Sequence, residues 1–264
     1  MHKLALALAL VLMVLAAMGL ALFRPWWFTP LASNWGALDR LIVFSLAVTG
    51  LAYLGINLFL AYVLAQRAPG RAAYLTDDRR LEGGLITLTT LGIVLLLAPG
   101  LYYYAQLVAP PRSALQVEVL GQQWIWAYRY PGPDGRLGRG EARLASPANP
   151  FGVDPRDPAA LDDVVVLGGP LHLPLNQPVL LLLRANDAIH NFYVPEFRVK
   201  MDAVPGMVTR IWFTPTRPGS FQVLCAEYCG LGHSRMVGQV QVEPPEAFAA
   251  WLEAQPTVAQ LMGQ

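Results

Sequence analysis

The sequence predicts a membrane-anchored all-β protein in which N-terminal transmembrane helices are followed by one β domain and a short C-terminal helix. The chain of 264 residues is 55% hydrophobic and 14% charged, which is too apolar for an ordinary soluble domain. Long charge-free segments occupy the first 111 residues. The remainder consists of short runs rich in β-branched and aromatic residues, bounded by glycine, proline or asparagine, as is typical of strands.

Three apolar segments are long enough to cross a membrane. Residues 4–23, 41–66 and 83–111 contain no charged side chain, and each reaches the roughly 20 residues that span about 30 Å of hydrocarbon. The first segment follows a basic start, so residues 1–23 form either a transmembrane helix or a secretory signal peptide. Its apolar run exceeds the roughly 7 to 15 residues of a usual signal core, which favours a retained helix.

Arginines between the second and third segments predict the orientation of the chain. Because cytoplasmic loops carry an excess of positive charge, we expect this loop in the cytoplasm and residues 112–264 on the periplasmic side of the cell inner membrane, as one domain of a multi-pass protein. That domain holds 12 Lys and Arg against 14 Asp and Glu, a balance of −2, which excludes a basic nucleic-acid surface. The arginines are Arg67, Arg71, Arg79 and Arg80.

The exported domain shows the pattern of a β-sandwich or β-barrel. Residues 131–163 are rich in Gly, Pro and Asp and interrupt the pattern, so they predict an inserted loop that either reaches a partner or is merely solvated. Residues 244–261 begin with prolines and continue with apolar residues at helical spacing, which predicts a terminal helix. The strand-like runs are 114–121, 122–130, 164–169, 178–186, 207–215, 219–226 and 237–244.

Both cysteines of the chain, Cys225 and Cys229, lie within twelve residues that also contain His233 and Met236. In an oxidising compartment, one interpretation is a disulfide. However, thiolate, imidazole and thioether donors on one loop favour copper and electron transfer. A mononuclear site of this kind needs one thiolate, whereas two thiolates can bridge a pair of copper ions.

A copper pair needs a second imidazole from elsewhere in the chain. His190 ends an apolar strand and enters a loop that a sandwich could bring beside the cysteines, so it is the candidate. His172 precedes a strand and is interpreted as a surface histidine, and His2 lies at the membrane terminus. Sequence spacing alone leaves the distance between His190 and the cysteines open.

Three stretches, 187–195, 197–206 and 225–236, resemble the purple-copper signature of subunit II of cytochrome c oxidase, and residues 121–130 are similar to the aromatic stretch of that family. The resemblance implies a cupredoxin-like Greek-key β-barrel that holds a dinuclear copper centre. It implies that Cys225 and Cys229 supply bridging thiolates and that His190 and His233 each supply an imidazole to one copper. Met236 would be a weak thioether ligand, and Glu227 would bind through its backbone carbonyl.

The same resemblance implies further roles. The Glu227 side chain would help to hold magnesium at the boundary with subunit I. Trp124 would be the indole through which an electron enters from docked cytochrome c, although aromatics at alternate strand positions more often pack in a core. Asp187 and Asp202 would contribute to docking, and Asn186 stands where an acid is common in the family.

Glu82 resembles a family glutamate near the mouth of a proton pathway. The Trp-Thr-x-x-Pro pattern that usually follows it in the family is missing here, so a simple interfacial anchor is the alternative.

The resemblance therefore implies subunit II of a haem-copper terminal oxidase, with subunits I and III, cytochrome c and the lipid membrane as partners. It would accept electrons from cytochrome c and pass them to haem in subunit I, where oxygen is reduced to water and protons are pumped. No catalytic residue for oxygen is expected on this chain. The alternatives are the copper subunit of a nitric oxide reductase, a membrane-anchored copper chaperone, and a structural β domain with a disulfide.

Overall fold

The computed structural model describes residues 2–23, 28–66 and 77–262, and it divides into two compact units. The first, here called the helical unit, comprises residues 1–28 and 37–104, and the second, the β unit, comprises residues 29–36 and 105–264. Arg67 and Arg71, which contribute to the predicted orientation, lie outside the described residues.

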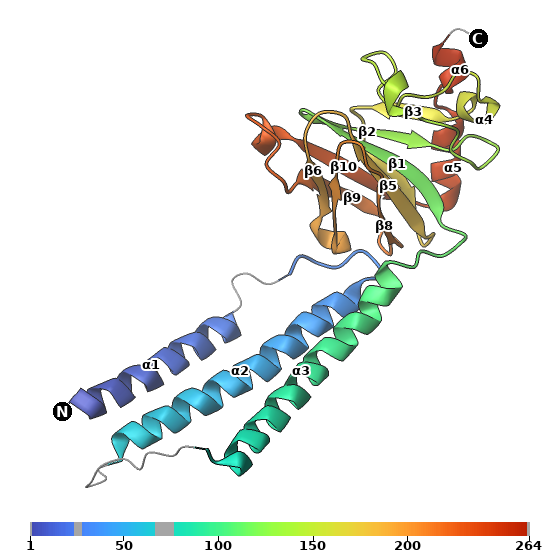
Figure 1. Ribbon diagram of the computed structural model, residues 1–264. Coiled ribbons are helices and arrows are strands. Elements are labelled where there is room, and N and C mark those ends of the chain that lie inside the picture. The colour runs from blue at the N-terminus through green and yellow to red at the C-terminus, as the bar shows by residue number, and fades with distance from the viewer. Residues whose placement is uncertain (1, 24–27, 67–76, 263–264) are drawn as a thin grey trace. The chain divides into compact units, whose positions relative to one another are not determined.

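The helical unit contains α1 (His2–Phe23), α2 (Gly36–Ala65) and α3 (Arg79–Leu107) (Figure 1). All three are long and apolar enough to cross a membrane. Most of their large apolar side chains are exposed, as expected for helices that face lipid or partner subunits. Ala7 and Val14 on α1 and Ala61 on α2 are buried, so the two helices approach each other through small side chains.

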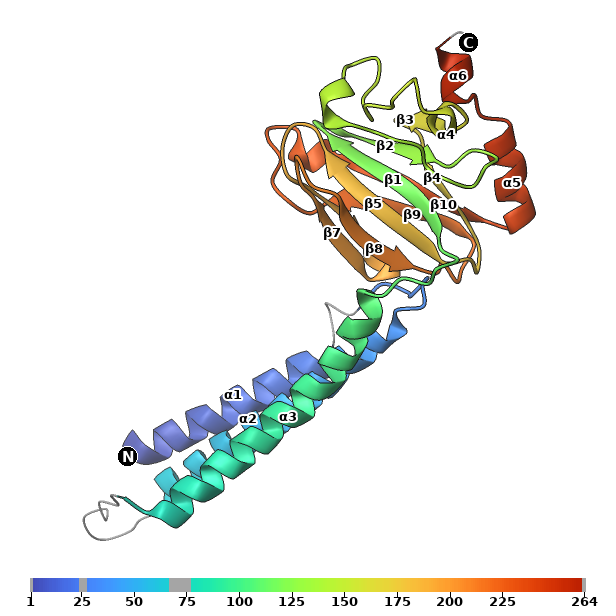
Figure 2. The ribbon, with the colours of Figure 1, turned by 45° about the vertical axis from the view of Figure 1, so that its right-hand side comes forward.

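The β unit is a sandwich of two five-stranded sheets (Figure 2). The first sheet has the order β3-β2-β1-β5-β8 and the second β4-β10-β9-β6-β7. Parallel pairs, β1 with β5 and β10 with β4, occur beside antiparallel neighbours, so strands distant in sequence meet within each sheet. The strands are β1 (Leu115–Gln122), β2 (Ile125–Tyr130), β3 (Val164–Leu167), β4 (Leu171–Pro174), β5 (Val179–Ala185), β6 (His190–Val194), β7 (Val199–Ala203), β8 (Thr209–Phe213), β9 (Gly219–Cys225) and β10 (Val237–Glu243).

The aromatic residues in and just before strand β2 are of two kinds, buried and exposed. Trp126, Tyr128 and Tyr130 are buried, and Trp126 meets Phe192 of the other sheet edge-to-face with ring centroids 5.4 Å apart. Trp124 precedes the strand, in the turn that joins β1 to β2, and is 39% exposed. Trp124 therefore lies outside the strand that the run at residues 122–130 predicted, and the other three aromatics are core residues.

The C-terminal region forms two short helices in place of the single predicted one. Helix α5 (Pro245–Glu253) packs Trp251 against Tyr130, and α6 (Val258–Leu261) begins after Pro256 with Thr257 as its N-cap. Proline cannot continue a helix by donating a backbone hydrogen bond, which explains the break. His172, interpreted from sequence as a surface histidine, is half-buried, and its ring stacks on Trp251 at 3.9 Å.

The insertion at residues 131–163 is part of the domain core. Phe151, Val153 and Ala160 are buried in one cluster with residues of β1, β2 and α6. At its base, Arg129 contacts Asp163 at 2.8 Å. The alternative that this segment is merely solvated is therefore wrong, because its apolar side chains complete the outer side of the first sheet.

Residues 29–36 also belong to the β unit, although nothing in the sequence pattern predicted it. The backbone N–H of Ala32 donates to the Glu196 carbonyl at 2.8 Å, and its carbonyl accepts from Thr216 at 2.9 Å. Trp35 is buried and meets Trp212 edge-on, with ring centroids 4.9 Å apart. This segment therefore extends the β unit with residues that precede α2.

Candidate metal centre

Pairing of β6 with β9 brings the separated donor residues together. His190 is the first residue of β6, Cys225 is the last residue of β9, and Phe192 lies opposite Cys225 in the ladder. The loop that follows β9 carries the remaining donors before β10 begins at Val237. Sheet topology thus places His190 beside the cysteine loop, as the sequence analysis required of a second imidazole.

The donor atoms form one cluster. The two thiols are free, and the Cys225 and Cys229 sulfurs lie 3.8 Å apart. The Cys229 sulfur lies 3.7 Å from His233 Nδ1 and 3.8 Å from Met236 Sδ, and His190 Nδ1 lies 3.1 Å from that same thioether sulfur. Among the described residues, one ligand atom each from His190, Cys225 and Cys229 falls within 4.8 Å of the others.

A backbone carbonyl completes this donor set. The oxygen of Glu227 lies 3.2 Å from the Cys225 sulfur, while the residue itself is exposed. The Glu227 carbonyl thus lies at the cluster, although the residue as a whole is exposed.

The cluster is largely shielded from water. His190, Cys229 and Met236 are at most 2% exposed, whereas Cys225 and His233 are half-buried. Burial raises the pKa of the Cys229 thiol to about 11, and the neighbouring Cys225 adds to this effect. The metal-free Cys229 side chain is therefore a neutral thiol at pH 7, and a bound cation has to displace its proton.

Asp187 orients the ring of His190. Its Oδ1 lies 2.8 Å from His190 Nε2, and its carboxylate also accepts from the backbone N–H groups of Gln123 at 2.7 Å and Ala188 at 2.6 Å. Partial burial alone would raise the pKa of Asp187, but these hydrogen bonds and the His190 charge together lower it below its ordinary value. An ionised Asp187 keeps the proton on Nε2 and leaves Nδ1 free to bind a metal.

Trp124 lies against the cysteine loop because two glycines permit the approach. A Cβ built on Gly232 would lie 2.2 Å from Cδ2 of the Trp124 indole, and one on Gly230 would lie 2.9 Å from the Gln123 amide nitrogen. That amide also donates to the Cys229 carbonyl at 2.7 Å. The glycines at alternate positions after Cys229 were a sequence signal for this close packing, and the sequence analysis did not use it.

The remaining predicted residues are dispersed. Asp202 is exposed on β7 and accepts from Asn191, the neighbour of His190, at 2.5 Å. Glu82 is exposed in the first turn of α3, in the helical unit. The contact between Asp187 and His190 was not predicted, although their spacing of three residues is visible in the sequence.

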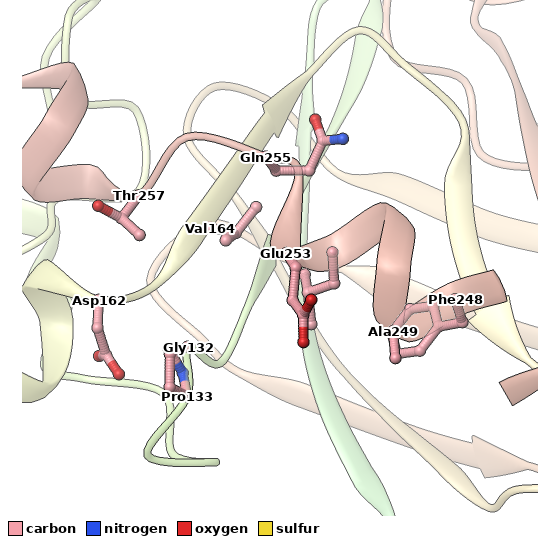
Figure 3. A pocket seen from close by; sticks show the side chains of 10 residues that line it. Gly132, Pro133, Asp162, Val164, Phe248, Ala249, Glu253, Gln255 and Thr257 are labelled. Atoms are coloured by element: carbon pink, nitrogen blue, oxygen red, sulfur yellow. The ribbon is translucent and has the colours of Figure 1, made fainter. Parts of the chain in front are cut away.

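A pocket of about 360 Å³ lies away from these donors, between α5 and the start of the insertion (Figure 3). Phe248 and Val164 contribute to its mainly apolar wall, and Asp162 and Glu253 line it as well. None of the metal donors described above lines it. It belongs to the packing of the C-terminal helices and carries no part of the metal centre.

Comparison with known proteins identifies the family. Residues 115–242 match the family described as "Cytochrome C oxidase subunit II, periplasmic domain". The chain is 47% identical over 263 residues to the alternative cytochrome c oxidase subunit 2 of Bradyrhizobium diazoefficiens, covering 98% of this chain and 95% of the relative. It is 30% identical over 240 residues to cytochrome c oxidase subunit 2 of Cereibacter sphaeroides, covering 85% and 77%.

Among solved structures, the periplasmic domain of subunit II of cytochrome oxidase from Bradyrhizobium japonicum matches with 27% identity and a TM-score of 0.42, covering 56% of this chain and 96% of that one.

The family match and the two relatives confirm the resemblance, and with the elements described above they confirm the predicted fold class of apolar helices, a cupredoxin-like β domain and a short helical C-terminal region. The chain is a membrane protein with its β domain on the outer side, and the family implies copper. Its homologues are subunits of a respiratory oxidoreductase. The protein belongs to the cytochrome c oxidase subunit II family.

Proposed function

We propose that this chain is the electron-accepting subunit of a haem-copper terminal oxidase. It receives electrons from cytochrome c at a dinuclear copper centre and passes them to haem in subunit I, where oxygen is reduced to water and protons are pumped. The observation that carries the proposal is the convergence of two thiols, two imidazoles, a thioether and a backbone carbonyl in one shielded cluster.

The donor set fits copper. Soft sulfur and imidazole donors favour copper over calcium, magnesium or manganese, which prefer oxygen. In this proposal the two thiolates and the two imidazoles would hold the copper pair, and the thioether and carbonyl would be weaker ligands. The residues in these roles are Cys225, Cys229, His190, His233, Met236 and Glu227. When bound, the pair supplies storage for one electron shared between two ions.

The protein contributes a rigid and mostly dry enclosure. The donors lie at the end of β9, at the start of β6 and in the loop before β10, so the sheet limits their movement. Gln123 holds the Cys229 carbonyl, and Asp187 holds the His190 ring. Because the ligands are held before the electron arrives, little reorganisation accompanies its arrival or departure.

Trp124 is the proposed point at which the electron enters. Its indole packs against Gly230 and Gly232 of the cysteine loop and remains 39% exposed. Tyr228 and Leu231 on that loop are 72% and 95% exposed, so the loop also offers apolar surface for docking. Asp187 and Asp202 contribute negative charge, but the domain balance of only −2 limits long-range steering.

The membrane part has a corresponding proposed arrangement. Residues 1–23, 41–66 and 83–111 cross the inner membrane, and residues 112–264 form the periplasmic copper domain. The burial of Ala7, which lines a groove together with Ala61 of α2, supports a retained first helix. The exposed Glu227 carboxylate is available for magnesium at the subunit I boundary, and Glu82 for proton uptake. Subunit III completes the complex.

Copper analysis of the full-length chain in detergent tests the copper centre. We expect two copper ions per chain and a seven-line hyperfine pattern in the low-temperature electron paramagnetic resonance spectrum, from one electron shared by equivalent nuclei. Cys225→Ser and Cys229→Ser should abolish that pattern. One copper per chain, or a four-line spectrum from the wild type, would contradict the proposal.

Turnover of the purified complex tests the acceptor. We expect cytochrome c oxidation to be coupled to oxygen consumption, and a complex that consumes nitric oxide in place of oxygen would favour the reductase alternative. A copper chaperone would normally carry such a cysteine motif at the start of a helix in a βαβ fold. Here Cys225 ends a strand of a β-sandwich, which argues against it.

A further inference from the structure

We propose that the insertion at residues 131–163 positions the metal-ligand loop, and that Asn186 is the positioning residue through which it acts. The ligand loop is defined here as residues 186–189, which connect β5 to His190. This inference rests on the proposed function only in taking His190 as a metal ligand. It assigns a task to an insertion whose role the sequence pattern left open.

The contact between the insertion and the ligand loop is direct. The side-chain amide of Asn186 donates to the backbone carbonyl of Pro150 at 2.8 Å. Two residues earlier in the chain, Arg184 Nη1 approaches the carbonyl of Phe151 at 3.4 Å. Pro150 and Phe151 are both buried. Two consecutive carbonyls of the insertion thus face the end of β5 and the start of the ligand loop.

The insertion can serve as a support because buried ion pairs fasten it to the first sheet. Arg129 Nη1 donates to the Gly138 carbonyl at 3.0 Å and to Asp163 at 2.8 Å, and its Nε donates to Glu118 at 2.6 Å. Glu118 also accepts from Arg184 at 2.6 Å. Removing one partner of such a buried pair is strongly destabilising, so this attachment resists displacement.

On its other side, the ligand loop is held by the carboxylate of Asp187. That carboxylate accepts from the Gln123 backbone and lies 2.8 Å from His190 Nε2. Asn186 is covalently adjacent to Asp187, so fixing the Asn186 side chain restricts the backbone that sets the direction of the carboxylate. The insertion therefore acts on the His190 ring through two successive residues.

The chemistry of the contact explains why an amide occupies position 186. A carbonyl oxygen accepts hydrogen bonds, and an ionised carboxylate has no proton to donate to it. An aspartate at this position would place two acceptors against each other. Asparagine at this position therefore supplies a hydrogen bond to the insertion that an ionised aspartate could not make.

Hydrogen exchange of the metal-free, full-length chain in detergent tests the inference. The Gln123 and Ala188 amides both donate to Asp187, and they fall within peptides 121–126 and 186–190. In Asn186→Asp we expect these peptides to exchange roughly two- to tenfold faster, as follows from losing one partly buried hydrogen bond. Peptides from the centres of β1 and β5 should be unchanged. Asn186→Ala, which adds no charge, should shift exchange in the same direction.

Asn34→Asp provides a matched control. The Asn34 side chain accepts from the Thr214 backbone at 2.7 Å through its oxygen, so an aspartate keeps that bond while making the same change of charge. Exchange in the two peptides should then match that of the wild type.

A second measurement reports on the His190 ring itself. In the metal-free chain, the Nε2 proton of His190 should be slow to exchange in the wild type and in Asn34→Asp, and faster in Asn186→Asp. This readout separates positioning of the ligand from general loosening of the insertion.

Unchanged exchange in both Asn186 variants, or equal acceleration in Asn34→Asp, would overturn the inference. These measurements need no copper, so they remain valid if the chain binds only one ion. That outcome would contradict the proposed copper centre and leave the positioning role intact.

Discussion

Replacing Gly232 by alanine tests whether close packing of Trp124 on the cysteine loop controls electron transfer into the protein. The backbone at Gly232 has φ −90° and ψ 8°, a conformation open to alanine, so the substitution acts through the added methyl group. That methyl would lie 2.2, 2.6 and 2.7 Å from three atoms of the Trp124 ring. The indole is rigid and cannot avoid the clash by bending.

The size of the disturbance follows from these distances. Carbon atoms in contact normally lie about 3.5 to 4.0 Å apart, so the ring and the loop must separate by roughly 1.3 to 1.8 Å. Overpacking of this kind costs about 1 to 3 kcal/mol in folding free energy. A displacement above 1 Å at a site that depends on geometry can lower a rate by about a hundredfold.

The assay compares two electron donors on the assembled oxidase. We expect Gly232→Ala to lower kcat/KM for cytochrome c at least about tenfold, while turnover with a small soluble reductant that needs no docking surface falls less. Gly92→Ala in α3 is the matched control, because a methyl group there meets nothing within 4 Å. Wild-type kcat/KM for cytochrome c and an unchanged melting temperature in Gly232→Ala would refute the packing argument.

Three further predictions concern charged groups of the β unit. Asp187→Asn removes the carboxylate that orients His190, so copper affinity should fall about 10- to 100-fold in a competition titration while the fold is kept; unchanged affinity would contradict the orienting role. Arg129→Met leaves the buried Glu118 and Asp163 without this cation and should destabilise the β unit by about 3 to 5 kcal/mol at pH 8, above the pKa of Asp163, with partial recovery in Arg129→Met/Asp163→Asn, as measured by denaturant unfolding; a double variant no more stable than the single one at this pH would argue against an unpaired charge. Burial raises the pKa of Asp163 from 3.8 to about 7 despite the opposing charge of Arg129, so the folded protein binds this proton more tightly than the unfolded chain. The resulting contribution to folding stability is complete below pH 3.8 and is lost as pH rises through about 7. Asp163→Asn should therefore make the melting temperature depend less on pH between pH 5 and 8. A melting temperature that falls equally steeply with pH in the wild type and in the variant would contradict this prediction.

Features of this protein that depend on local chemistry can be predicted from the amino-acid sequence alone. Charge-free runs of sufficient length predict membrane helices because lipid excludes charges and unpaired backbone groups, whatever the rest of the chain does. The donors Cys225, Cys229, His233 and Met236 share one short loop, so their type and spacing already favour copper. Alternating apolar residues and turn signals predict a β domain for the same local reason.

Features that depend on strand pairing across long separations in sequence are visible only in the folded protein. His190 stands 35 residues before Cys225, and only the pairing of β6 with β9 brings its ring to the sulfurs. Packing likewise buries the insertion and brings Asn186 to Pro150, contacts for which sequence periodicity carries no signal. Periodicity reports which face of an element is apolar, whereas the partner of that face is selected by the folded chain as a whole.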